Sequence, residues 1–249
     1  MAGLLEVCVD SLPSARAAVS AGADRLELCA GLTVGGLTPY TALLKQIRAE
    51  LDIPIRCLMR HRAGDFLYTA EEVALLAEQI RELRSAGADG FVIGCLTPDG
   101  RLDKAAMAPL LEATEGCGTT LHRCIDVSVN PEQTYLDAME LGIDTVLTSG
   151  AAASCLEGID IIARLLDLRD THNGPEVLVG AGVNASVISR FRRELPTARA
   201  FHMSGKKELE SGMIFRRKGV PMGLPGLDEF HIQQTDPIAI LAARAALEN

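Results

Sequence analysis

The sequence contains no tryptophan, and aromatic residues make up only 4% of its 249 residues. Hydrophobic residues nevertheless reach 48%, so the core must be built from leucine, isoleucine, valine and alanine. This hydrophobic fraction excludes an intrinsically disordered chain, because burying it offsets the entropy lost on ordering. The length suggests one or two domains, and α/β barrels commonly run to about 250 residues as a single domain.

The chain also lacks an excess of positive charge. Lys and Arg total 24 against 33 Asp and Glu, which leaves a formal net charge of −9. An acidic protein repels phosphate backbones, so we expect no nucleic-acid partner. No segment approaches the roughly 20 apolar residues of a membrane span, and residues 1–10 lack the basic region of a secretory signal. We therefore expect no membrane partner.

No CxxC spacing occurs among the seven cysteines. An odd number of scattered cysteines argues against a disulfide framework and against a structural zinc site. A reducing compartment suits such a chain, and we expect a cytoplasmic protein.

Short apolar runs alternate with longer helical stretches along the chain. Eight runs have strand character, at residues 4–9, 25–29, 53–59, 90–93, 119–124, 145–147, 176–179 and 199–203. Seven helical stretches follow them, at residues 14–21, 41–50, 70–85, 104–113, 131–141, 154–168 and 185–194. This alternation predicts a closed α/β barrel of the (β/α)8 TIM type. An open doubly wound sheet is the alternative, but the first turn lacks the glycine-rich fingerprint of that fold.

A repeated phrase supports the barrel. The sequences Ala21-Gly-Ala-Asp24, Ala86-Gly-Ala-Asp89 and Leu141-Gly-Ile-Asp144 precede the second, fourth and sixth strands. Glycine at these points predicts helices that end in the left-handed conformation. Since no linker interrupts the pattern, we predict a single domain over residues 1–249. The barrel would occupy about 4–210 and a C-terminal loop and helix about 211–249, with the loop at 219–226 and the helix at 236–247.

Charged side chains interrupt the apolar strands near their C-terminal ends, where barrel enzymes place their active sites. An unpaired buried charge is costly, so a group of such residues predicts a polar site. The catalytic candidates are Glu6, Glu27, Arg60, His122, Arg123, Asp126 and His202. We expect His122, Cys124 and Asp126 to share one face of the fifth strand. For Glu6, pairing with an arginine across the barrel is an equally good interpretation.

Two further sites are suggested at the same rim. Gly180 and Gly182 follow the seventh strand and Ser204 follows the eighth, a position where barrels often bind phosphate through backbone N–H groups. Cys8 and Cys29 end two neighbouring strands, about 4.8 Å apart, and thiolates bind soft ions such as Cu(I). His122, Asp126 and His202 could add ligands. Ordinary tight turns and buried free cysteines are the simpler alternatives.

Several separated motifs, in order, resemble the CutC family, known as the copper homeostasis protein CutC. They are Glu6-Val-Cys8-Val-Asp10-Ser11, Gly22-Ala-Asp24-Arg25-Leu-Glu27-Leu-Cys29, Gly35-Gly36-Leu-Thr38-Pro39, Gly64-Asp65-Phe66, His122-Arg123 with Asp126, Leu147-Thr148-Ser149-Gly150, Ala181-Gly182, His202 with Ser204, and Ser211-Gly-Met213 with Arg216. The resemblance implies a TIM-barrel-like fold, a cytosolic location and a role in copper handling, with Cys8 and Cys29 inside its motifs. The chain departs from the family pattern at His61, Ala63, Cys124, Ile125 and Tyr40.

Two main hypotheses follow. The first is a protein of copper homeostasis that binds a copper ion at Cys8 and Cys29. The second is a barrel enzyme acting on a small anionic substrate, either phosphorylated or a carboxylate. In it Glu6 or Glu27 is the general base, His122 or His202 the acid, and Arg60, Arg62 and Arg123 clamp the anion. A scaffold for a partner protein, or a homo-oligomer, has no specific residue to support it.

Overall fold

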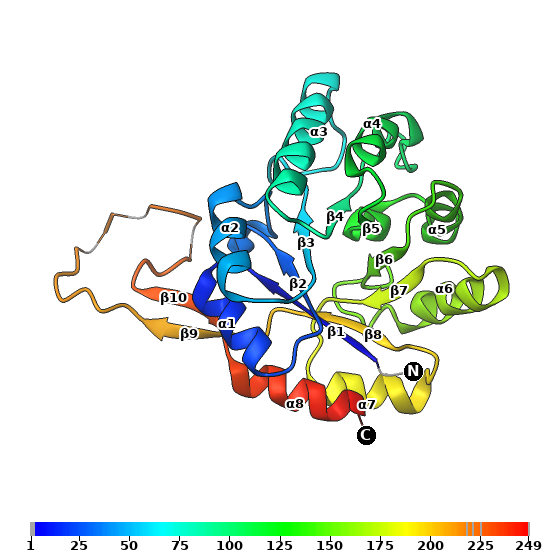
Figure 1. The fold of residues 1–249 in the computed structure, drawn as a ribbon. Coiled ribbons are helices and arrows are strands. Elements are labelled where there is room, and N and C mark those ends of the chain that lie inside the picture. The colour runs from blue at the N-terminus through cyan, green and yellow to red at the C-terminus, as the bar shows by residue number, and fades with distance from the viewer. Residues whose placement is uncertain (1–2, 218, 221, 225, 249) are drawn as a thin grey trace.

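Eight parallel strands close into a barrel in chain order, β1 to β8 (Figure 1). A computed structural model describes residues 3–217, 219–220, 222–224 and 226–248. The strands are β1 (Leu4–Val9), β2 (Arg25–Leu28), β3 (Ile55–Leu58), β4 (Gly90–Ile93), β5 (Gly118–Leu121), β6 (Thr145–Thr148), β7 (Glu176–Val179) and β8 (Ala200–Met203). This order confirms the predicted TIM-type barrel.

Helices cover the outside of the barrel (Figure 1). They are α1 (Leu12–Ser20), α2 (Thr41–Glu50), α3 (Ala70–Ser85), α4 (Lys104–Thr114), α5 (Pro131–Glu140), α6 (Ile159–His172), α7 (Ala185–Glu194) and α8 (Pro237–Glu248), with two 3-10 helices, η1 (Leu32–Val34) and η2 (Arg123–Val127). Among the described residues, no helix has the length and apolar character needed to cross a bilayer.

Two predicted elements, the fifth strand and the sixth helix, have boundaries that were wrong by three residues or more. The fifth strand ends at Leu121 rather than at residue 124, because the His122 ring accepts a hydrogen bond from the Cys124 N–H and begins η2. Cys124 and Asp126 therefore lie on a 3-10 turn and not on a strand face. The sixth helix starts at Ile159 rather than at residue 154, since turns occupy the segment before it.

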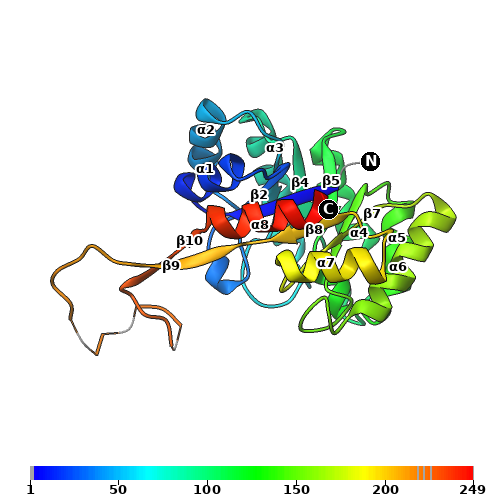
Figure 2. The ribbon, with the colours of Figure 1, turned by 90° about the horizontal axis from the view of Figure 1, so that it is seen from below.

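A two-stranded arm projects from the barrel between β8 and α8 (Figure 2). It consists of β9 (Lys206–Glu210) and β10 (His231–Thr235), which pair antiparallel. The sequence predicted only a loop at 219–226, of which residues 221 and 225 lie outside the described part. The arm carries exposed apolar side chains, among them Ile214 and Phe215. Helix α8 follows it, close to the predicted position.

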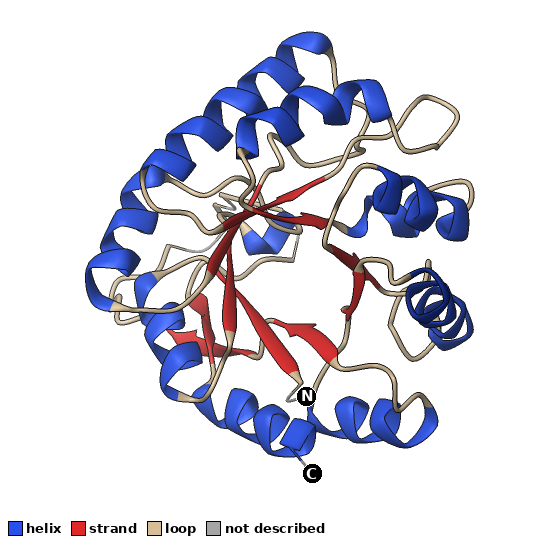
Figure 3. Cartoon of the chain, turned by 45° about the vertical axis from the view of Figure 1, so that its right-hand side comes forward, coloured by secondary structure: helices blue, strands red, loops and turns tan. Residues whose placement is uncertain are grey.

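The strands form a ring inside the circle of helices (Figure 3). Their outward side chains, such as Leu5, Val7 and Val9 of β1, are fully buried in the main apolar core. Because strand side chains alternate, the residues between them point into the ring. Many of these inward residues are charged, and Glu6 and Glu27 are both buried. The barrel interior therefore combines charged side chains with two small apolar clusters, whereas the outer core is mainly aliphatic.

The repeated Gly-X-Asp phrase joins strands at the N-terminal end of the barrel. Its glycines have positive φ angles, as predicted: +94° at Gly22, +100° at Gly87 and +74° at Gly142. Each aspartate accepts a backbone N–H from the start of the neighbouring strand. The distances are 2.7 Å from Leu5 N to Asp24, 2.7 Å from Ile55 N to Asp89 and 2.6 Å from Thr119 N to Asp144. Three pairs of strands are thereby tied together.

Arg56 crosses this end of the barrel interior. Its Nη1 donates to the hydroxyls of Thr120 and Thr145, and its Nη2 lies 2.7 Å from the Asp144 carboxylate. Two glycines leave room for it. A Cβ atom on Gly90 would lie 2.9 Å from Arg56 Cγ and 2.5 Å from the Gly118 carbonyl oxygen.

We expect Gly90→Ala to lower the free energy of unfolding by about 1–3 kcal/mol, because the added methyl overpacks the interior. Chemical denaturation would measure the change. Gly212→Ala is the control, since no described heavy atom lies within 4 Å of its added Cβ. Equal stability of the two variants would contradict the interpretation.

Candidate functional site

A cavity of about 520 Å³ opens at the C-terminal ends of the strands. Most of the residues singled out in the sequence line it: Cys8, Glu27, Arg60, His122, Arg123, Asp126, Gly182, His202 and Ser204. Glu6, Cys29 and Gly180 are not part of its wall. The barrel mouth thus gathers side chains from distant parts of the chain, and their catalytic roles stay predictions.

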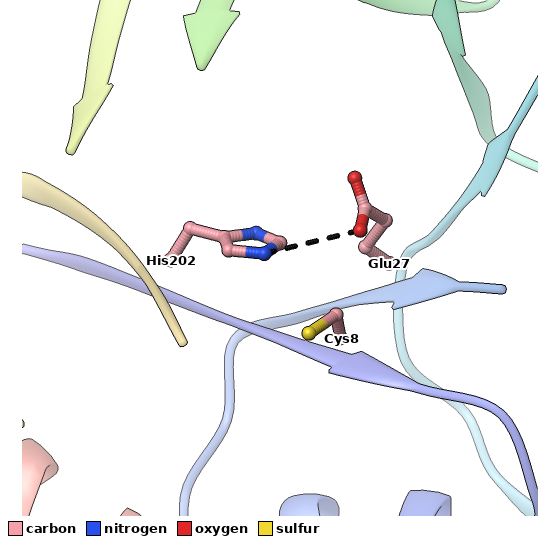
Figure 4. A group of neighbouring side chains, drawn as sticks. All are labelled: Cys8, Glu27 and His202. Carbon is pink, nitrogen blue, oxygen red and sulfur yellow. Dashed lines mark ion pairs between the residues drawn. The ribbon is translucent and has the colours of Figure 1, made fainter. Parts of the chain in front are cut away.

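Three potential metal ligands meet on the side formed by β8, β1 and β2 (Figure 4). One ligand atom each from Cys8, Glu27 and His202 lies within 4.8 Å of the others. His202 Nε2 is 3.9 Å from Glu27 Oε2. Strand register explains the cluster, since Cys8 is level with Glu27 and β8 pairs with β1 on the other side.

Glu6 is the inward-facing residue before Cys8 on β1, and its register partners are Arg25 on β2 and His202 on β8. Its Oε1 is 2.8 Å from His202 Nδ1, and its Oε2 accepts a hydrogen bond from Arg25 Nε at 2.5 Å. The Glu6 side chain is fully buried. Glu6 therefore pairs with an arginine, though on the adjacent strand, and at the same time orients the imidazole of His202.

These contacts shift the pKa values of the buried groups in different directions. Burial raises the pKa of Glu6, but the hydrogen bond from His202 and the charge of Arg25 outweigh it and lower the pKa to about 2. Burial lowers the pKa of His202, but Glu27 and Cys8 raise it well above 6.5. Burial raises the pKa of Glu27, against the charge of His202. At neutral pH a Glu6 carboxylate therefore faces a His202 imidazolium.

Cys29 is placed differently from Cys8. Its thiol lies 3.3 Å from Glu27 Oε2, to which it donates, and it is fully buried. Burial and the charge of Glu27 raise its pKa well above the ordinary value, so it stays a thiol. Both cysteines contact the same small apolar cluster with Leu58 and Val92. Cys8 faces the cavity, whereas Cys29 positions the Glu27 carboxylate.

A second polar group occupies the side of the cavity formed after β3 and β5. This group consists of Arg60 and His122. The Phe66 ring contacts both, with its centre 5.5 Å from Arg60 Cζ and 4.6 Å from the ring centre of His122. Gly94 at the end of β4 leaves room for the imidazole, because a Cβ there would be 2.5 Å from His122 Cε1. Phe66 was not a candidate from the sequence, although it belongs to the Gly64-Asp65-Phe66 motif.

His122 is 4% exposed. Burial, followed by the charge of Arg60, lowers its pKa to about 3, so the ring is neutral at physiological pH. Since Nδ1 accepts the Cys124 N–H at 3.2 Å, the ring proton is on Nε2. That Nε2–H has no partner among the described residues.

Asp126 and Arg123 serve a different purpose. Asp126 accepts hydrogen bonds from the Thr148 hydroxyl, the Ser149 N–H and the Arg123 guanidinium, at 2.6–3.1 Å. Its oxygens are occupied, so it ties η2 to the end of β6. Gly182 and Ser204 line the cavity, but the start of α7 is already capped by Asn184, which accepts the Ser186 N–H.

We expect Glu6→Gln to lower the free energy of unfolding by about 3–5 kcal/mol, because Arg25 would lose its buried counter-charge. The matched control is Glu132→Gln, which breaks the exposed pair with Arg164 and should cost less than about 1 kcal/mol. Denaturant titration at pH 7 measures both. A loss for Glu6→Gln as small as that of the control would refute the buried pairing.

His122 should also make stability depend on pH. Below pH 6.5 this ring is protonated in the unfolded chain, whereas in the folded chain it stays neutral down to about pH 3. Because the unfolded chain binds the extra proton, the free energy of unfolding should fall as the pH is lowered from 6.5 toward 3. His122 contributes up to about 1.4 kcal/mol per pH unit to this fall. His122→Asn should flatten the profile between pH 6.5 and 5, with exposed His172→Asn as the control for losing a histidine. Parallel profiles of wild type and His122→Asn would contradict the buried neutral ring.

Comparison with known proteins identifies the family. The family model described as "CutC family" matches residues 3–207. A family protein CutC from Chromobacterium violaceum is 39% identical over 246 residues, covering 98% of each chain. The human copper homeostasis protein cutC homolog is 36% identical, covering 99% of this chain and 89% of that protein.

Solved structures give the same result. A crystal structure of CutC from Streptococcus agalactiae superimposes with a TM-score of 0.76 at 27% identity, covering 81% of this chain and 98% of that chain. Phosphoribosylanthranilate isomerase from Thermotoga maritima, at 12% identity, has a TM-score of 0.56 and shares the fold alone. With the family model and these relatives covering most of its length, the chain belongs to the CutC family.

Proposed function

We propose that this protein acts in copper homeostasis by binding a copper ion at Cys8, Glu27 and His202. The observation that carries the proposal is the convergence of a thiol, a carboxylate and an imidazole within 4.8 Å at the barrel mouth. Sulfur and nitrogen ligands favour Cu(I). The copper homeostasis name of the human relative supports the same ion.

The spacing of the ligand atoms suits one ion. Two atoms that each lie about 2.0–2.3 Å from a metal, as at zinc sites, are about 3–4.5 Å apart. The 3.9 Å between His202 Nε2 and Glu27 Oε2 falls in that range. Glu6 supports the arrangement from below, because a carboxylate that accepts the Nδ1–H turns Nε2 toward the ion. The ion must displace the Nε2 proton of the imidazolium, so binding at this site releases a proton.

The two cysteines have unequal roles in this proposal. Cys8 supplies the sulfur ligand, since it belongs to the cluster that faces the cavity. Cys29 acts through Glu27, to which its thiol donates. A hydroxyl could replace that thiol as a donor, whereas a hydroxyl at position 8 is a poor ligand for a soft ion.

We expect Cys8→Ser to weaken Cu(I) binding by about 100-fold or more, and Cys29→Ser by about tenfold or less, because ligand loss exceeds the loss of a supporting contact. Anaerobic competition with a chromophoric Cu(I) chelator measures both. Cys117→Ser, in the turn before β5, is the control. A Cys8→Ser protein with the affinity of the control would reject the site.

A further inference from the structure

Arg60 carries a buried positive charge without a carboxylate partner. The residue is 9% exposed, and within the part of the chain that the structure describes its side chain donates to carbonyl oxygens and pairs with no carboxylate. Its Nη1 donates to the carbonyl oxygens of Val34 and Gly36 at 2.9 and 3.0 Å, and its Nη2 donates to that of Gly64 at 3.0 Å. These contacts hold two loops at the cavity mouth.

The guanidinium has donors to spare. It has five N–H groups, and the three carbonyl contacts leave one on Nε and one on Nη2. Nε is buried and lacks a partner within the described residues. Nε and Nη2 lie along one edge of the planar group, an arrangement that binds two oxygens of a carboxylate or a phosphate.

His122 offers a third donor in the lining of the same cavity. Its Nε2–H is buried and unpartnered in the described chain, and both side chains line the cavity. The Phe66 ring contacts both side chains and also lines the cavity, so the three residues belong to one part of its wall. Buried donors without partners are rare in folded proteins, and a role in binding an acceptor group explains two of them in one cavity wall.

We propose that the barrel mouth binds a small organic anion, whose carboxylate or phosphate oxygens accept hydrogen bonds from Arg60 Nε and Nη2 and from His122 Nε2. The lining residue Lys206 adds positive charge, and about 520 Å³ accommodates a metabolite-sized molecule. This site uses residues that follow β3 and β5, whereas the copper ligands lie on β1, β2 and β8. The inference therefore does not rest on copper binding.

Ligand-induced stabilisation of the copper-free full chain tests the proposal. Inorganic phosphate and malonate are titrated at constant ionic strength set with sodium chloride, and malonamide is the uncharged analogue. The melting temperature should rise with the concentration of phosphate or malonate and stay constant with malonamide. Phosphate alone would indicate a phosphorylated ligand, and malonate alone a carboxylic acid. A melting temperature that follows neither anion would overturn the proposal.

The residues are tested by substitution. Arg60→Lys keeps the charge but loses the two-donor edge, and should raise the dissociation constant about tenfold or more. Arg62→Lys is the matched control, because Arg62 is more exposed and already pairs with Asp65 and Glu72. Equal affinities of the two variants would reject Arg60 as the binding group.

A direct measurement guards against misfolding of Arg60→Lys. In the wild-type protein labelled with ¹⁵N-histidine, the Nε2–H resonance of His122 should shift on titration with whichever anion stabilises the fold. His122→Asn assigns that signal. An unmoved His122 resonance at saturating anion would also overturn the site.

Discussion

The buried carboxylate of Glu6 is the interaction on which the barrel mouth depends. It joins Arg25 and His202 from the two strands that flank β1, at 2.5 and 2.8 Å. A charge without water is tolerated only when its partners compensate it, so the three side chains hold one another in a single arrangement. Glu6 thereby fixes the orientation of the His202 imidazole before any ligand binds. The positions of the potential ligands in its cluster depend on that orientation.

A polar interior imposes a second constraint, because large charged groups need space that a filled barrel would not leave. Glycines provide it at two levels. Gly90 makes room for the Arg56 side chain near the bottom, and Gly94 makes room for the His122 ring near the top. Most of the aliphatic packing lies on the outer faces of the strands, where the helices cover it. The inward faces carry the charged groups of the site, together with small apolar clusters such as Leu147 with Leu178.

The cavity has two chemically different sides. Toward β1, β2 and β8 it presents sulfur, nitrogen and oxygen atoms that can hold a cation once the His202 Nε2 proton has left, with Glu6 beneath them. Toward β3 and β5 it presents N–H donors of Arg60 and His122, which suit an anion. An ion and an organic anion could thus occupy one cavity without competing for residues. The proposed copper function and the proposed anion site therefore rest on different residues.

The sequence by itself determined the barrel, because eight apolar runs alternating with helical stretches have few other solutions, and because the Gly-X-Asp phrase recurs before the second, fourth and sixth strands. It also identified the charged residues of the rim, since a charge within an apolar strand needs a partner. The sequence did not determine the register of the strands or the geometry of the turn after β5. Only the tertiary structure decided that Cys8 rather than Cys29 joins Glu27 and His202 in one cluster of potential ligands, and that Asp126 is occupied by backbone and hydroxyl donors. Those outcomes depend on strand pairing and on the 3-10 turn after β5, which join residues far apart in the chain.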